Sequence, residues 1–140
     1  MKMTNTIKLT AVALTATFGL AIAAAAQDAG TLPPASTKQG VTYATDIKTI
    51  LDASCVKCHS GDKPKARLKL DNLENTLKGG KDGKIVTAGD SANSFIVKSV
   101  AHLTADHDTW MPPLQNRAGI KPLTPEQISL IRAWIDQGAK

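Results

Sequence analysis

Cys55-Val56-Lys57-Cys58-His59 is the stretch that decides the fold, and its two cysteines are the only ones in the 140-residue chain. On a helical turn, residues spaced i, i+3 and i+4 share one face, so both thiols and the imidazole would point the same way. The spacing C-x-x-C-H is the attachment signature of c-type haem. It lets Cys55 and Cys58 form thioether bonds to two vinyl groups while His59 binds the iron as proximal ligand. The pentapeptide therefore predicts one covalently attached haem c per chain.

Three other kinds of site could use the same two cysteines. A thioredoxin-like redox pair needs a C-x-x-C beside a βαβ pattern, and no strand pattern precedes Cys55. A disulfide would close a four-residue loop and remove little chain entropy. A zinc site could add His102 and His107, whose mutual spacing fits. However, 43 residues separate Cys58 from His102, and His59 would then have no role. Zinc and disulfide stay as alternatives.

The N-terminus has the pattern of a secretory signal. Two lysines, an apolar run over residues 9–22 and an A-x-A cleavage site at residues 24–26 predict a signal peptide over residues 1–26. An uncleaved membrane anchor is the alternative, although the run is near the shortest length that spans a bilayer. Export agrees with the haem prediction, because c-type haem is attached outside the bacterial cytoplasm. The expected location is therefore periplasmic or otherwise exported.

Cleavage would also change the charge and define the domain. It removes two lysines and no acidic residue, so the formal charge falls from +5 to +3. Two haem propionates would bring this close to neutral, and basic residues do not alternate with aromatic ones, so no nucleic-acid partner is expected. Residues 27–42, with several Pro and Gly and no periodicity, predict a flexible leader. Residues 43–140 suffice for one small domain, with no membrane span after signal cleavage.

The apolar pattern of this domain predicts helices and a thin core. It contains only four aromatic residues, and small domains with few large apolar side chains usually need a staple or a cofactor. Periodicity predicts a helix over residues 43–54 leading into Cys55, and a short one around residues 73–77. A third helix, capped by Asp90 or Ser91, is expected to run through Phe95, Ile96 and Val100.

The last helix has the strongest local signals. Thr124 is the expected N-cap, Pro125 the first helical residue, and Gln127 completes a capping box. Its apolar stripe ends before Gly138 and consists of Ile128, Ile131, Trp134 and Ile135. No two segments alternate as a β-hairpin does. The predicted fold class is all-α: a small helical domain with long loops around a covalently attached haem.

Met111 is the predicted sixth ligand of the iron. It is the only methionine after residue 26, and Pro112 and Pro113 restrict the backbone directly behind it. Thioether sulfur is a soft ligand, and Met/His ligation raises the reduction potential. His102 and His107 are the competing ligands. The second ring nitrogen of His59 is expected to donate to a backbone carbonyl, for which the loop at residues 63–65 is the candidate.

The whole domain resembles a small monohaem cytochrome c, and more narrowly the Planctomycete-type cytochrome c domain. The matching stretches are Ile50-Leu51, Cys55-Val56-Lys57-Cys58-His59, Leu68-Lys69-Leu70-Asp71, Lys78-Gly79-Gly80, Gly89-Asp90 with Ser94, Trp110-Met111-Pro112-Pro113, Leu123-Thr124-Pro125 and Trp134-Ile135-Asp136-Gln137-Gly138-Ala139. The resemblance implies a cytochrome c-like fold in which the first and last helices cross. It also implies Cys55 and Cys58 as haem-attachment residues, His59 as proximal ligand and Met111 as distal ligand.

Electron transfer between redox partners is the leading functional hypothesis. The chain has no Ser-His-Asp pattern and no phosphate-loop fingerprint, so a carrier is favoured over an enzyme. A basic stretch after the haem motif could dock an acidic redox partner or neutralise a propionate, and consists of Lys63, Lys65, Arg67 and Lys69. The first alternative is an enzyme or sensor with an open iron, using His102 or His107 toward peroxide or a small gas. The second is a binding module in which haem is structural.

Overall fold

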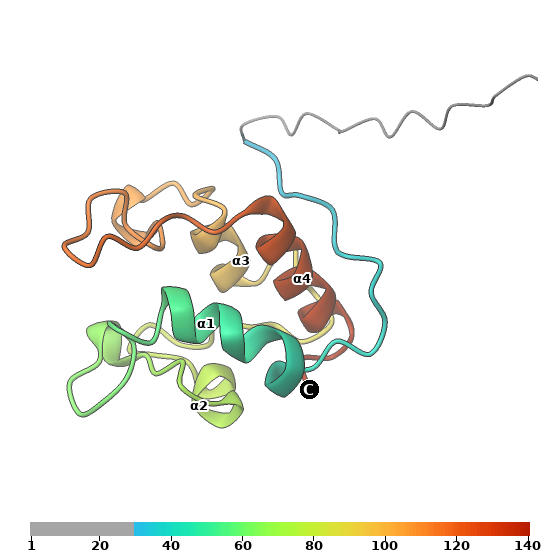
Figure 1. Cartoon of the computed structure of the whole chain (residues 1–140), viewed down its shortest axis with the longest axis horizontal. Helices are drawn as coiled ribbons and strands as arrows, with labels where there is room; N and C mark the ends of the chain where they lie inside the picture. The colour runs from blue at the N-terminus through green and yellow to red at the C-terminus, as the bar shows by residue number, and fades with distance from the viewer. Residues whose placement is uncertain (1–29) are drawn as a thin grey trace, which may run out of the picture.

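The computed structural model describes residues 30–140, so the predicted signal peptide and the start of the predicted leader lie outside the described residues. The helical elements are η1 (Tyr43–Ile47), α1 (Lys48–Ser54), η2 (Lys65–Arg67), α2 (Leu73–Lys78), α3 (Phe95–Val100), η3 (His107–Thr109) and α4 (Pro125–Asp136) (Figure 1). In this part of the chain no strand forms beyond a single bridge between Gly80 and Gly83. The predicted all-α class is therefore confirmed.

The last helix is built as its sequence predicts. The Thr124 hydroxyl accepts a hydrogen bond from the N–H of Gln127, and the Gln127 side chain accepts one from the N–H of Thr124, which completes the capping box. Pro125 opens the helix, where its missing N–H costs nothing. The predicted apolar stripe is buried, with Ala133 in addition.

The core forms where the first and last helical segments meet. The rings of Tyr43 and Trp134 lie 6.0 Å apart at 55°. Tyr43 also donates its hydroxyl to the carbonyl of Leu70 at 3.2 Å, which ties the chain after the haem motif to this contact. At the C-terminus, the carbonyl of Lys140 accepts from the Trp134 indole at 3.0 Å and from the N–H of Tyr43 at 2.8 Å. These hydrogen bonds join the first and the last residues of the domain.

Residues 43–54 form one continuous helical segment, as predicted, although its first part, η1, is a π-helix. Thr42 caps it by accepting from the N–H of Thr45. Its buried face is formed by Tyr43, Ile47, Ile50 and Leu51. The N–H of Cys55 donates to the carbonyl of Leu51 at 2.8 Å, so the helix delivers the haem motif in a fixed orientation.

The predicted cap of α3 is wrong. The N-cap is Ser94, not Asp90 or Ser91. The Asp90 carboxylate accepts from the N–H of Asn93 at 3.0 Å and so closes a separate turn. The Ser91 hydroxyl donates to Asp136 at 2.9 Å on α4. Both side chains are engaged elsewhere, and the helix begins at Phe95, after Ser94 in an extended backbone conformation.

Residues 30–42 pack along α4, where the sequence led us to expect a flexible leader. The N–H of Ser36 donates to the carbonyl of Ser129 at 2.9 Å. The Arg132 guanidinium bonds the carbonyl of Pro33. Gln137 accepts from the N–H of Val41 at 3.1 Å. Figure 1 shows this segment running beside α4. These contacts join irregular chain to residues about a hundred positions away, which periodicity does not reveal.

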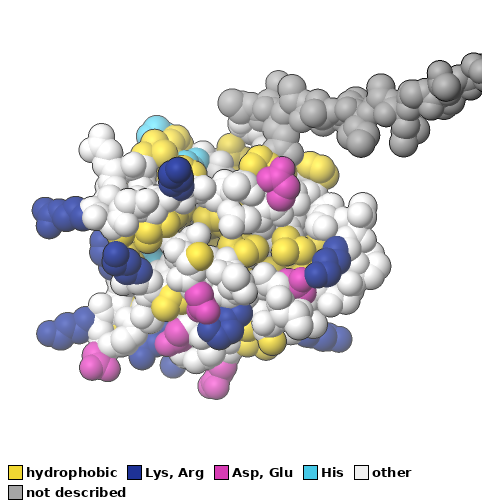
Figure 2. Space-filling model, viewed as in Figure 1, with side chains coloured by type: hydrophobic (Ala, Val, Ile, Leu, Met, Phe, Trp, Pro, Cys, Tyr) yellow, Lys and Arg dark blue, Asp and Glu magenta, His cyan; other side chains and the backbone are white. Residues whose placement is uncertain are grey.

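Basic side chains gather at one end of the molecule. Figure 2 shows Lys and Arg projecting from the side on which, in Figure 1, the loop after α1 and the loop before α4 lie. The exposed basic residues of these two loops are Lys57, Lys63, Lys65, Arg67, Arg117 and Lys121, which we call the basic end. Within residues 30–140 none of the six forms an ion pair.

No helix in this range combines the length and the apolar character that a membrane crossing requires.

Candidate functional site

A pocket of about 560 Å³ separates the haem motif from α3 and the loop that precedes α4. Its lining is mostly apolar and includes Leu68, Leu70, Ile85, Phe95, Ile96, Val100, Pro112 and Ile120. Three exposed carboxylates, Asp82, Asp106 and Asp108, also contribute to it. The volume falls within the range of roughly 300–1,000 Å³ that is typical of sites for drug-sized ligands and cofactors.

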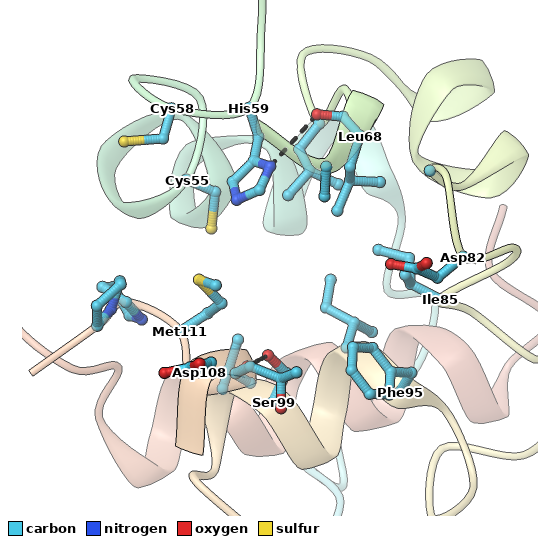
Figure 3. Close-up of a pocket in the computed structure, with 18 of the residues that line it drawn as sticks. Cys55, Cys58, His59, Leu68, Asp82, Ile85, Phe95, Ser99, Asp108 and Met111 are labelled. Carbon is cyan, nitrogen blue, oxygen red and sulfur yellow. Dashed lines mark hydrogen bonds between the residues drawn. The ribbon is translucent and has the colours of Figure 1, made fainter. Parts of the chain in front are cut away.

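The four predicted site residues all line this pocket. Cys55, Cys58 and His59 lie on one wall, and Met111 lies on the opposite wall (Figure 3). The N–H groups of Cys58 and His59 both bond the carbonyl of Cys55 at 3.0 Å, so the pentapeptide continues the helical path beyond α1. The Cys55 thiol and the His59 ring point into the pocket, while the Cys58 sulfur points to the side. Both cysteines are free thiols.

His59 is held as a metal ligand needs to be. Its Nδ1 lies 3.3 Å from the carbonyl of Leu68. A carbonyl can only accept, so Nδ1 carries the proton and Nε2 keeps its lone pair on the pocket side. Burial lowers the pKa of His59 and outweighs its hydrogen bonds to the Leu68 and Lys65 backbone, with the charge of Lys65 acting in the same direction as burial. The ring is therefore neutral at pH 7.

The carbonyl that orients His59 comes from farther along the loop than predicted. The carbonyl 3.3 Å from Nδ1 belongs to Leu68, three residues beyond the expected residues 63–65, and the Lys65 backbone makes a lesser contribution to the pKa of the ring. Two backbone bonds fix this loop on the haem motif, from Lys65 to the carbonyl of Cys58 at 3.0 Å and from Leu70 to the carbonyl of His59 at 2.8 Å. The loop turns back through Ala66 and Arg67, both at positive φ, which sequence periodicity cannot anticipate.

The environment of Cys55 argues against the alternatives for the cysteine pair. Burial, followed by the charge of Cys58, raises the pKa of the Cys55 thiol to about 12. Redox-active cysteines are thiolates with lowered pKa values, so Cys55 is poorly suited to a redox role. In the described range, moreover, no three His, Cys, Asp or Glu side chains are grouped so that they could hold a metal ion. The cysteines and His102 or His107 do not come together.

Met111 faces His59 across the pocket, and the competing histidines do not line it. Both histidines instead contact Trp110. The His102 ring stacks on the indole at 5.0 Å and 5°, and the His107 ring lies 4.0 Å from it at 37°. Met111 is fixed through its N–H, which donates to the carbonyl of Ser99 at 3.1 Å. Pro112, directly behind it, is buried.

Two lysines in the pocket lining were missed by the sequence reasoning. Lys81 and Lys84 belong to the turn that follows α2, and both line the pocket. The turn packs closely on the loop that orients His59, since the N–H of Lys81 donates to the carbonyl of Ala66 at 2.8 Å. A Cβ at Gly80 would lie 2.7 Å from that same oxygen, which explains the glycine. No pattern in the sequence indicated that this turn lies beside the haem motif.

The comparisons with known proteins agree with this site. Residues 55–115 match the family model described as Planctomycete cytochrome C, a range that runs from the haem motif to just beyond Met111. No protein of curated function matches the chain, and no solved structure matches it. The family match confirms the resemblance seen in the sequence. A domain of this kind implies a haem, redox protein partners and a role in electron transfer.

Proposed function

Because residues 55–115 match the family model of Planctomycete cytochrome C, we propose that this protein is an exported monohaem cytochrome c that carries single electrons between redox partners. The observation that carries the proposal is the placement of His59 and Met111 on opposite walls of one apolar pocket, next to the thiol of Cys55. A neutral imidazole and a thioether are the pair of axial ligands that cytochromes c use.

The residues present fit a covalently held haem. The thiols of Cys55 and Cys58 would each add across one vinyl double bond, so that a carbon–sulfur bond forms and the thiol hydrogen goes to the neighbouring carbon. His59 would bind the iron through Nε2, and Met111 through its sulfur. Lys81 and Lys84 would offset the charge of the two propionates. When bound, the haem supplies an iron that takes up and releases one electron.

The protein side of this chemistry is to set the potential and to keep other ligands out. As an iron ligand, Met111 would favour the reduced state because a thioether donates little charge. The apolar lining lowers the local polarity and restricts water, which also tunes the potential. His102 and His107 lie outside the pocket lining, so neither is placed to act as the acid–base group that peroxide chemistry would need. We therefore favour the carrier over the open-iron enzyme.

The partner we propose is a redox protein with an acidic docking surface. The residues of the basic end lie on the two loops that border the pocket. Their side chains form no ion pair within residues 30–140. Complementary charges steer encounter and raise association rates. We expect the rate of electron exchange with an acidic partner to fall as salt rises from about 0.01 to 0.15 M, where the Debye length shortens from about 30 to 8 Å. A rate independent of salt would rule out this docking mode.

A spectroelectrochemical titration of the exported, purified protein tests the proposed function. We expect one reversible one-electron transition and low-spin spectra in both oxidation states, because the two axial ligands would stay in place. A five-coordinate, high-spin spectrum in either state would favour the open-iron enzyme. A potential outside the range of biological partners would favour a structural haem.

A further inference from the structure

Ser99 is a buried polar residue on an otherwise apolar face of α3. Its exposed fraction is 4 %, and the residues around it on the helix, Ile96, Val97 and Val100, are buried apolar side chains. A buried hydroxyl costs free energy unless it is hydrogen-bonded. A serine at this buried position therefore suggests a role for its hydroxyl, because alanine would avoid the free-energy cost of burying a polar group.

Both polar groups of Ser99 reach the segment that carries Met111. Its hydroxyl donates to the carbonyl of Thr109 (Figure 3). Its carbonyl accepts from the N–H of Met111 at 3.1 Å. The two bonds bracket Trp110, so they fix the backbone on both sides of the residue that precedes Met111. They join residues 109–111 to the C-terminal end of α3.

The rest of this segment is held by contacts that do not reach Met111 directly. The Trp110 indole donates to the carbonyl of Thr104 at 3.1 Å. The Thr109 hydroxyl donates to the hydroxyl of Thr104 at 2.7 Å. These bonds close the segment on itself. Among residues 30–140, Ser99 is the side chain whose hydrogen bond anchors it to α3 beside the pocket.

We propose that Ser99 is a positioning residue that holds the Met111 sulfur in place as the sixth ligand. The inference rests on the proposed function, since it assumes that Met111 binds the iron. Without the hydroxyl, the carbonyl of Thr109 loses its buried donor and the segment can shift away from α3. Met111 then competes less well with an external ligand.

The test measures imidazole binding to the ferric holoprotein, because imidazole must displace Met111. Ser99→Ala is expected to bind imidazole about fivefold more tightly than wild type, the factor that one hydrogen bond typically contributes to an equilibrium constant. The far-red sulfur-to-iron band should weaken in parallel. The matched control is Ser94→Ala. Ser94 is also buried and is the N-cap residue of α3, but its hydroxyl bonds the backbone of Thr87 and Asp90 and not the Met111 segment. It should lower the unfolding temperature and leave the imidazole affinity unchanged.

A second pair of variants isolates the hydroxyl if Ser99→Ala does not assemble. Ser99→Thr and Ser99→Val introduce β-branched side chains of similar shape, of which only threonine keeps the hydroxyl, so the Thr variant should bind imidazole more weakly than the Val variant. Equal affinities in wild type and Ser99→Ala, with the far-red band present in both, would overturn the positioning role and leave the proposed function intact. Absence of the band from wild type would instead overturn Met111 ligation, and the role of Ser99 with it.

Discussion

Replacing Met111 with alanine is expected to open the iron to external ligands. Ferric wild-type protein should have the weak far-red band of a sulfur–iron bond, and the ferrous protein should resist carbon monoxide. Met111→Ala should lose the band and bind carbon monoxide readily. Its reduction potential should fall by on the order of 100 mV or more, because the thioether favours ferrous iron and axial ligands set haem potentials over about 0.8 V.

His102→Ala and His107→Ala are the controls for this experiment. Both side chains contact Trp110, next to Met111, but neither lines the pocket. Their spectra and their resistance to carbon monoxide should match those of wild type. Ready binding of carbon monoxide by the wild-type ferrous protein would contradict Met111 ligation. It would move a peroxide or gas-binding function ahead of electron transfer.

Removing both attachment residues is expected to destabilise the fold strongly. Cys55→Ala combined with Cys58→Ala leaves an apolar pocket of about 560 Å³ with no covalent hold on the group that would fill it. Domains are stable by only about 5–15 kcal/mol, and a group that binds only the folded state adds to that stability. A loss of about 3–4 kcal/mol would lower the Tm by roughly 15–25 °C in a domain of this size. Circular dichroism during heating measures the change.

Ser60→Ala is the matched control for the double variant. Ser60 follows the motif directly and its hydroxyl donates to the carbonyl of Val56 at 2.7 Å, so this variant perturbs the same turn while both thiols remain. It should keep the haem and lose little stability. If the double cysteine variant unfolds as cooperatively as wild type and at the same temperature, the haem is not the centre of the core.

Local signals account for what could be predicted from the sequence. Thr124, Pro125 and Gln127 lie within four residues of one another, and their capping pattern defined the start of α4. The haem motif is equally local, and its five residues predicted the side chains that line one wall of the pocket. Met111 could be singled out because no other methionine follows residue 26. In each case the informative residues are neighbours in the chain or unique in it.

Contacts between distant residues account for what was missed. The cap of α3 was misassigned because Ser91 bonds Asp136, 45 positions away. The packing of residues 30–42 depends on Arg132 and Gln137, which lie about a hundred positions along the chain. The loop that orients His59 brings the carbonyl of Leu68 to Nδ1 of the ring through turns at positive φ. None of these contacts has a periodic pattern, so only the folded chain reveals them.

The intact mass of the exported protein, measured after extraction with acid and organic solvent, tests the central claim most directly. We expect the mass of the chain plus one haem, because two thioether bonds at Cys55 and Cys58 would survive denaturation. Recovery of free haem together with a bare chain, whether its cysteines are free thiols or a disulfide, would contradict covalent attachment.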